Sequence, residues 1–218
     1  MSIRVVIADD HPVVRDGLRL TIERNGPAIV VVGEAAEGIE VLERAKTIPV
    51  DVFILDITMP RLNGIEAARE LRTRYPAAKV IVLRFHDAKA MVDEALSAGA
   101  LGYLTKETAT RHVVEAITEV HAGRYYLSPQ IAHFVVEAGR LAKAGTRPRG
   151  AAPLALTRQE RRVLQLIAEG QSSKEIAATL GLSPNTVHSH RTSVMAKLDI
   201  HKDTDLVRYA IKAGIAKA

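Results

Sequence analysis

Three aspartates and one lysine stand at points of the sequence where they could build a pocket for a cation and a phosphoryl group. Asp9 and Asp10 follow the apolar run "IRVVIA", Asp56 follows "VDVFIL", and Lys106 ends the run "LGYLTK". Carboxylates that converge in one crevice are costly unless a divalent cation neutralises them, and oxygen ligands suit Mg²⁺ or Mn²⁺. Asp56 would then be free to attack phosphorus, and Lys106 would pair with a phosphoryl oxygen. The alternative is that the aspartates only cap helices.

A parallel sheet would position these residues. Short, β-branched apolar runs alternate with amphipathic segments along the first part of the chain, as expected for strands that are covered on both faces. The expected strands are 3–8, 28–33, 50–55, 79–84 and 101–106, and the expected helices lie near 12–24, 37–47, 63–74, 88–98 and 109–122. This (βα)5 pattern predicts a doubly wound α/β sheet with right-handed crossovers. If the first and third strands are neighbours, the three carboxylates meet at the carboxyl edge, where such sheets bind ligands.

The last part of the chain carries strong helix signals of a different kind. Capping boxes are expected at 157–160 ("TRQE") and 172–175 ("SSKE"), each before an apolar run. The second helix ends at Gly181, Ser183-Pro184 opens a third helix, and a fourth is expected near 203–214. A short helix, a three-residue turn and a longer helix are typical of a helix-turn-helix. We therefore predict an all-α, four-helix domain at this end.

The third of these helices has an apolar side and a polar side. Val187, Val194, Met195 and Leu198 fall on one face at 100° per residue, so we expect this face to be buried. On the outer face, residues that could reach base edges in the major groove are His188, Ser189 and Thr192, with Asn185 beside them. Residues placed to contact phosphates are Lys174, Thr186, Arg191 and Lys197. Any one of these residues could instead be a surface residue without a role.

Charge and composition agree with a nucleic-acid partner for the C-terminal part. Residues 1–142 contain 17 basic and 19 acidic residues, whereas residues 154–218 contain 10 basic and 6 acidic residues. A weakly acidic part joined to a basic part indicates that a polyanion meets the C-terminal end, although a solvated basic surface would look the same. Aromatic residues make up only 4% of the chain, which argues against base stacking on single strands. The expected partner is double-stranded DNA.

Further features bound the organisation of the chain and its location. We place one domain at 1–123, a linker at 124–153 with a short helix that starts at Ser128-Pro129, and a second domain at 154–218. The chain has no cysteine, which excludes disulfides and thiolate metal sites. No apolar run approaches the roughly 18 residues of a spanning helix, and "MSIRVVIADD" lacks a signal-peptide layout. We expect a cytoplasmic protein without a membrane contact.

The motifs in both parts together resemble a known family. Asp9-Asp10, "FILDITMPRLNGIE", "GALGYLTK" and "LTRQERRVLQLIAEGQSSKEIAATLGLSPNTVHSHRTSVMAKLDI" are similar to the two-domain response regulators of the NarL/FixJ type. These proteins have a receiver domain followed by a LuxR-type DNA-binding domain. The resemblance covers nearly the whole chain except the linker. It implies that a histidine kinase donates a phosphoryl group, that Mg²⁺ is the cofactor, and that a homodimer binds DNA to regulate transcription.

The resemblance also implies roles for single residues. Asp56 would be the phospho-acceptor, and Lys106 would contact the phosphoryl group. Asp10 would bind Mg²⁺ directly, Asp9 would lie in the outer shell, and the backbone carbonyl of Thr58 would complete the metal site. Tyr103 would be the aromatic residue that switches between two positions. Met59-Pro60 and Gly64 would shape the loop after the acceptor. The base contacts would come from the positions of His188, Ser189 and Thr192, and the apolar stripe of the fourth helix would dimerise or pack within the domain.

One position departs from the family pattern. The family has Ser or Thr at the end of the fourth strand, where this chain reads "VIVLR" and has Arg84. The guanidinium of Arg84 would pair with Asp56 and hold the receiver in one state, or bind phosphoryl oxygens, or point to solvent without a role. In each case the coupling between a hydroxyl and Tyr103 cannot be assumed. The hypothesis that follows is an altered activation step.

Two competing functions follow from the same residues. The first is a phosphorylation-independent DNA-binding transcription factor with a receiver altered by Arg84, although Asp9, Asp10, Asp56 and Lys106 are all present. The second is an aspartyl-phosphate phosphatase on a similar sheet. Such enzymes usually carry a second acid two residues after the nucleophile, and here that residue is Thr58. We therefore predict a regulator rather than an enzyme.

Overall fold

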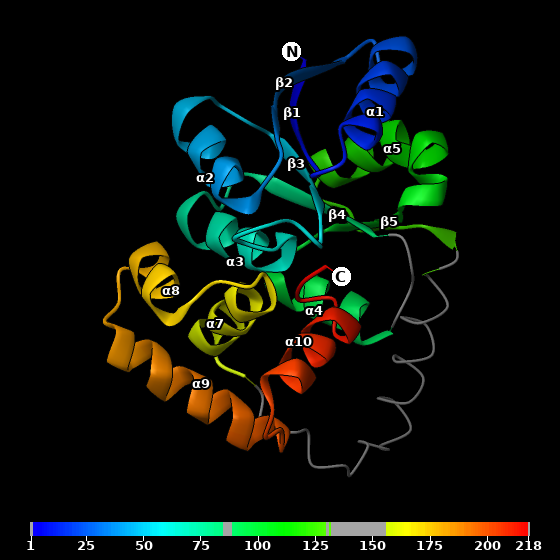
Figure 1. Ribbon diagram of the computed structural model, residues 1–218. Helices are drawn as coiled ribbons and strands as arrows, with labels where there is room; N and C mark the ends of the chain where they lie inside the picture. Colours follow the sequence, from blue (N-terminus) through cyan, green and yellow to red (C-terminus); the bar gives the residue numbers. More distant parts are fainter. Residues whose placement is uncertain (1, 85–88, 130, 132–155, 218) are drawn as a thin grey trace. The chain divides into compact units, whose positions relative to one another are not determined.

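The computed structural model describes residues 2–84, 89–129, 131 and 156–217, and its internal contacts divide the chain into two compact units. The N-terminal unit contains a β-sheet with helices, and the C-terminal unit is helical (Figure 1). This confirms the predicted combination of an α/β part with an all-α part. Among the described residues, no helix is both long enough and apolar enough to cross a membrane.

The sheet of the N-terminal unit is parallel, and its strand order places the first and third strands side by side. In the described part of the chain the order is β2-β1-β3-β4-β5-β6. The strands are β1 (Ile3–Ala8), β2 (Ile29–Ala35), β3 (Val52–Asp56), β4 (Lys79–Arg84), β5 (Gly102–Thr105) and β6 (Tyr126–Leu127). Ala8 of β1 is in register with Leu55 of β3, so the two strands end together. The strand order therefore reverses beside β1, as predicted.

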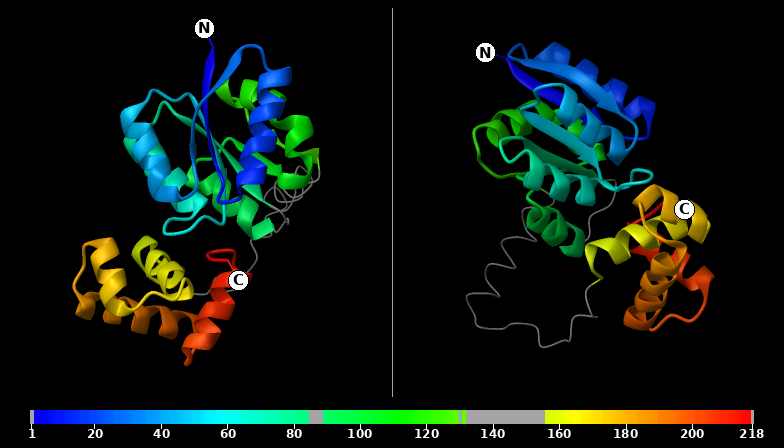
Figure 2. Two further views of the ribbon diagram at one scale, coloured as in Figure 1. Left: turned by 45° about the horizontal axis from the view of Figure 1, so that its top comes forward. Right: turned by 90° about the vertical axis from the view of Figure 1, so that its left-hand side faces the viewer.

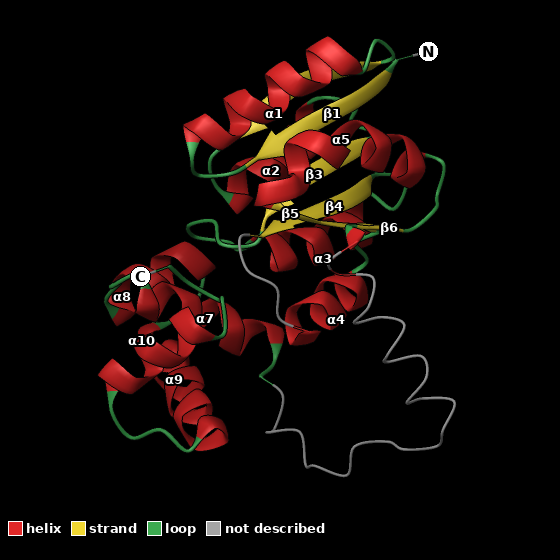
Figure 3. Ribbon diagram, turned by 90° about the vertical axis from the view of Figure 1, so that its right-hand side faces the viewer, coloured by secondary structure: helices red, strands yellow, loops and turns green. Residues whose placement is uncertain are grey.

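Helices cover both faces of this sheet (Figure 3). They are α1 (Pro12–Asn25), α2 (Gly38–Thr47), α3 (Gly64–Arg74), α4 (Lys89–Ala98) and α5 (Lys106–His121). Helices α1 and α5 pack together on one face, and α2, α3 and α4 follow one another on the other. Under α1 and α5, fully buried residues such as Ile7, Ile54 and Leu83 meet Val113 of α5. Burial on both faces explains why the strands are continuous apolar runs.

The sixth strand lies in the stretch that the sequence analysis places in the linker. It pairs with β5: the backbone N–H of Tyr126 donates to Leu101 O (2.9 Å), and that of Ser128 donates to Tyr103 O (3.1 Å). A strand of two residues has too few side chains to show an alternating pattern, so only the pairing reveals it. The rest of the predicted linker and most of its short helix lie outside the described residues.

The C-terminal unit has the predicted helix-turn-helix layout. Its described helices are α7 (Arg158–Ala168), α8 (Ser173–Leu180), α9 (Pro184–Leu198) and α10 (Asp203–Lys212). Both predicted capping boxes are present, and Gly181 ends α8 in the left-handed conformation with φ of +66°. Figure 2 shows the long α9 (orange) beside α7 and α8. Because side-chain caps mark the starts of α7, α8 and α9, and Gly181 marks the end of α8, these bounds were predictable.

Two small apolar clusters hold these helices together. Val187 of α9 packs with Val163 and Ile176, whereas Val194 packs with Leu164 and Leu206. Met195 and Leu198 are partly buried against the second cluster, which confirms the predicted inward face of α9. In α10, Leu206 and Ala210 are fully buried in the second of these clusters. A dimer contact through α10 remains a prediction.

Candidate functional site

The predicted carboxylates meet at the carboxyl edge of the sheet. Asp9 and Asp10 follow β1, Asp56 ends β3, and one ligand atom from each of these residues and from His11 lies within 4.8 Å of the others. Asp9 is fully buried and Asp56 is 1% exposed, while the Asp10 side chain is 20% exposed. Two buried carboxylates this close repel each other strongly unless positive charge is supplied.

Lys106 supplies positive charge from the far end of β5. Its Nζ lies 2.5 Å from Asp9 Oδ2 and 3.1 Å from Asp56 Oδ2, and its side chain is only 3% exposed. Lys106 is the first residue of α5, so the change from strand to helix aims the side chain across the strand ends. The structure thus brings together the three aspartates and the lysine that the sequence singled out.

The loop after β3 closes tightly over the backbone of Asp56. A Cβ atom on Gly64 would lie 2.1 Å from the carbonyl oxygen of Asp56, so this position admits no side chain. The N–H of Gly64 donates to Ile57 O (2.9 Å), and the Asn63 side chain caps α3. Thr58 donates its hydroxyl to Asp56 Oδ2 (3.3 Å). The loop is therefore fixed to the carboxylate; the role predicted for the Thr58 carbonyl remains a prediction.

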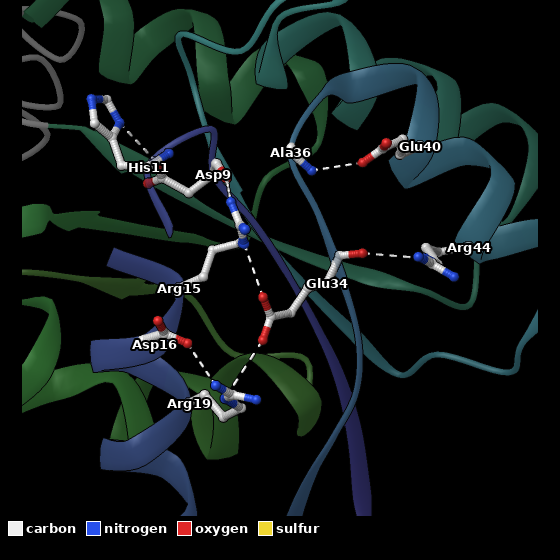
Figure 4. A network of polar contacts seen from close by, with 9 residues as sticks. All are labelled: Asp9, His11, Arg15, Asp16, Arg19, Glu34, Ala36, Glu40 and Arg44. Carbon is white, nitrogen blue, oxygen red and sulfur yellow. Dashed lines mark hydrogen bonds and ion pairs between the residues drawn. The ribbon is translucent and has the colours of Figure 1, made fainter. Parts of the chain in front are cut away.

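His11 and Arg15 belong to the surroundings of the pocket, and the sequence interpretation missed both (Figure 4). His11 Nδ1 lies 3.1 Å from Asp9 Oδ1 and 3.0 Å from Asp10 Oδ1, and its N–H donates to Asp9 Oδ1 (2.9 Å). Arg15 donates to the carbonyl oxygen of Asp9 (2.6 Å). The adjacency of His11 to two aspartates was a usable signal. No local signal marks Arg15, because it reaches Asp9 from the first turns of α1.

Arg84 and Tyr103 lie on neighbouring strands at the same side of the sheet. Arg84 ends β4 in register with Thr105 of β5, and Tyr103 is in register with Val82. Arg84 is partly buried, and its Nη1 has no hydrogen-bond partner among the described residues. The described residues include no ion pair between Arg84 and Asp56. Tyr103 is fully buried within β5. The switching role of Tyr103 and the three interpretations of Arg84 remain predictions.

Most residues of the predicted DNA-binding set are exposed on α9, and Lys174 is exposed on α8. The exposed members of the predicted DNA-binding set are Lys174, Asn185, Thr186, His188, Ser189 and Thr192. Arg191 is partly buried and forms an ion pair with Asp203. Lys197 Nζ lies 2.7 Å from Glu160 Oε2. The charges of Arg191 and Lys197 are thus already paired within the unit. A phosphate contact by either residue would require its present ion pair to be broken or shared, which costs free energy.

The buried side chain of Glu160 connects two helices of the C-terminal unit by hydrogen bonds. Its carboxylate accepts hydrogen bonds from Lys197 Nζ (2.7 Å), Ser193 Oγ (2.5 Å) and the N–H of Thr157 (2.7 Å). Burial alone would raise its pKa, but the hydrogen bonds from Lys197, Ser193 and Thr157 outweigh burial and lower the pKa of Glu160 to about 2. Glu160 therefore stays charged and ties α7 to α9.

Comparisons with known proteins match both units. Residues 5–118 match the family of response regulator receiver domains, and residues 154–210 match the bacterial regulatory proteins of the luxR family. A buried acidic pocket on one unit and a helix-turn-helix on the other define the class of DNA-binding regulators that carry a receiver.

Relatives in sequence and structure narrow this class. The response regulator UvrY of Escherichia coli K12 is 36% identical over 218 residues, which cover 99% of this chain and 97% of UvrY. UhpA of the same strain, a transcriptional regulatory protein, is 38% identical over 94% of this chain and 96% of its own. A structure of the response regulator RcsB from Salmonella typhimurium superposes with a TM-score of 0.67, at 26% identity, over 95% of this chain and 96% of RcsB. The chain belongs to the response regulators with a receiver domain and a LuxR-type DNA-binding domain.

Proposed function

We propose that a histidine kinase phosphorylates Asp56, and that the phosphoryl group controls dimerisation and binding to double-stranded DNA, and thereby transcription in the cytoplasm. The observation that carries this proposal is the position of Asp56. Its buried carboxylate ends β3, 3.1 Å from Lys106 Nζ, in a group of carboxylates whose ligand atoms lie within 4.8 Å of one another. Solved RcsB structures include complexes with DNA, one of them with a phosphomimetic.

The donor set of the pocket fits Mg²⁺. Asp9, Asp10 and Asp56 offer carboxylate oxygens, and two of the three are buried beside a single lysine. Asp10, Asp56 and the Thr58 carbonyl would hold the ion directly, with Asp9 in the outer shell. When bound, the ion screens negative charge between the carboxylate and the incoming phosphoryl group.

The protein's own residues then account for the transfer. A carboxylate oxygen of Asp56 attacks phosphorus, a P–O bond forms, and the P–N bond to the kinase histidine breaks. The electron pair of that bond stays on the imidazole nitrogen, which takes up a proton from water. Lys106 Nζ, already beside Asp56, pairs with a phosphoryl oxygen in the product. The product is an acyl phosphate that serves as a signal.

At the other end, exposed side chains on α9 would read the DNA. His188, Ser189 and Thr192 lie on the exposed face, and Asn185 stands near the start of the helix. Hydroxyls and imidazoles discriminate bases less strongly than arginine does on guanine. Affinity would then depend on phosphate contacts from residues such as Lys174, and on two half-sites read by a dimer.

The test combines phosphorylation with DNA binding. The full chain is treated with acetyl phosphate and Mg²⁺, and intact-mass spectrometry counts the phosphoryl groups. A DNA sequence selected from a random duplex pool then serves as the probe in fluorescence anisotropy. We expect one phosphoryl group, roughly tenfold tighter DNA binding, and loss of both in Asp56→Asn. Asp16→Asn, at an exposed carboxylate on α1, is the matched control. Equal DNA binding in all samples would overturn the proposal.

Arg84 supports a second candidate, a regulator that binds DNA without phosphorylation. A guanidinium nitrogen that is buried without a hydrogen-bond partner among the described residues carries a desolvation cost. The family has a hydroxyl at this position. Here the guanidinium of Arg84 would take its place and hold the receiver in one state. Wild type would then bind DNA equally with and without acetyl phosphate, and Arg84→Thr would restore the response. An equal response in wild type and Arg84→Thr would refute this candidate.

A further inference from the structure

A polar network connects the acidic pocket with the edge strand β2, and Arg15 is its central residue (Figure 4). Arg15 Nη1 donates to the backbone carbonyl of Asp9 (2.6 Å), and its Nε donates to Glu34 Oε2 (2.9 Å). The Arg15 side chain is 16% exposed and that of Glu34 is 29% exposed, so the pair is largely removed from water. A shielded ion pair holds its geometry more firmly than an exposed one.

The contact with the Asp9 carbonyl acts on Asp10. The carbonyl of Asp9 and the N–H of Asp10 share one rigid peptide plane, so a donor on that oxygen fixes the plane from which the Asp10 side chain starts. The preceding plane is fixed as well, because the N–H of Asp9 donates to Ala35 O (3.1 Å). Both planes around Asp9 are therefore tied to β2, one directly and one through Arg15 and Glu34.

An irregularity in the sheet places Glu34 where Arg15 can reach it. Val5 is in register with Val31, but Val6 is in register with Gly33, so β2 contains one extra residue, Val32. Strict alternation from Val31 would put residue 34 on the opposite face of the sheet. Because of the extra residue, Glu34 instead lies on the same face of the sheet as Val31. Glu34 is in register with Ile7, whose side chain lies in the core under α1 and α5.

A second arginine in the same network provides a contrast. Arg19 Nη2 donates to Asp16 Oδ1 (2.6 Å), and its Nε lies 3.6 Å from Glu34 Oε1. Its side chain is 43% exposed, and its described contacts do not include Asp9 or Asp10. Arg15 and Arg19 thus share Glu34 as a partner, but among the described contacts only Arg15 also reaches Asp9.

We propose that Arg15, oriented by Glu34, is a positioning residue for the acidic pocket: it holds the Asp9–Asp10 peptide in the orientation that binds a divalent cation. This inference rests on the proposed metal site. Residues that orient metal ligands typically change metal affinity by 10–100-fold when they are replaced. The described contacts of Arg15 are with the Asp9 carbonyl and Glu34 and do not include Asp56, so its loss would act on cation affinity through the Asp9–Asp10 peptide.

The experiment measures cation binding without any phosphodonor. Mn²⁺ is titrated into the full-length wild type, Arg15→Gln, Glu34→Gln and Arg19→Gln, and the electron paramagnetic resonance signal reports free Mn²⁺. We expect roughly tenfold weaker binding in Arg15→Gln and Glu34→Gln, and unchanged binding in Arg19→Gln. The double variant Arg15→Gln/Glu34→Gln should lose no more Mn²⁺ affinity than Arg15→Gln alone, because both residues act through the contact with the Asp9 carbonyl. Thermal unfolding identifies any variant that fails to fold.

A second measurement separates positioning from general structural damage. Initial rates of phosphorylation by acetyl phosphate, taken over a range of Mg²⁺ concentrations, should show a higher half-saturating concentration in Arg15→Gln with a nearly unchanged maximal rate. Unchanged Mn²⁺ binding in folded Arg15→Gln, or an equal loss in Arg19→Gln, would overturn the inference alone. A wild type that binds no Mn²⁺, or binds it as Asp10→Asn does, would overturn the proposed metal site and the inference with it.

Discussion

Replacement of Glu160 by glutamine should destabilise the C-terminal unit strongly at neutral pH. Glu160 is 4% exposed, and it joins the first turn of α7 to Ser193 and Lys197 of α9. Glutamine keeps the size of the side chain and one acceptor oxygen. It removes the charge that pairs with Lys197 and leaves that ammonium, whose side chain is 21% exposed, without its anion.

The magnitude follows from the pKa of Glu160. Its pKa falls from 4.5 in the unfolded chain to about 2 in the folded unit. The charged form is therefore favoured in the folded state by about 3 kcal/mol. This contribution is fully present above the unfolded pKa and is lost as the pH falls toward the folded pKa. We expect Glu160→Gln to cost about 3 kcal/mol at pH 7, and the gap to wild type to narrow between about pH 4.5 and 2.

The assay must read each unit of the chain separately. Full-length protein is equilibrated in a urea series at pH 7 and at pH 3, and pulse hydrogen exchange with mass spectrometry follows peptides within 156–217. The matched control is Glu175→Gln, because Glu175 completes the same capping box on α8 but is exposed. Its pKa is also lowered, by the hydrogen bonds from Ser172. A loss in Glu160→Gln no larger than in Glu175→Gln, or a difference from wild type independent of pH, would refute the reasoning.

Other substitutions test the remaining contacts. Gly64→Ala should slow phosphorylation by roughly 100-fold, since its Cβ would lie 2.1 Å from the Asp56 carbonyl oxygen and displace the acceptor; Gly17→Ala in α1, where a Cβ meets nothing within 4 Å, should leave the rate unchanged. A normal rate in Gly64→Ala would contradict this. Lys174→Ala should lower the slope of DNA affinity against salt by about one without loss of stability. Lys197→Ala should instead destabilise the C-terminal unit, because Glu160 stays buried without its cation; urea unfolding distinguishes the two.

Much of the architecture was predictable because local patterns encode it. Continuous apolar runs marked the five longer strands, and caps and glycines marked the helices of the C-terminal unit. The pocket was predictable for a different reason. Parallel strands carry their carboxyl ends to one edge, so the neighbouring strands β1 and β3 place Asp9 beside Asp56 once the strand order is set, and the long side chain of Lys106 reaches both from the end of β5.

Pairing across space was beyond the reach of such patterns. Strand β6 is too short to show alternation. In the sequence Lys197 looks like an exposed cation on a DNA-binding helix, but in the structure it pairs with the buried Glu160. Both depend on which segment packs against which, and neither residue of a long-range pair signals its partner.

The sequence by itself determined the chemistry of the pocket: three carboxylates and a lysine, each at or just after the end of a strand. The tertiary structure decided how the pocket is held. One extra residue in β2 turns Glu34 to the face that α1 covers, and there it meets Arg15. The side chains along a strand alternate with a period of two, so a register shift of a single residue changes the face of every residue after it. That shift arises from the pairing of β1 with β2, and only the folded sheet reveals it.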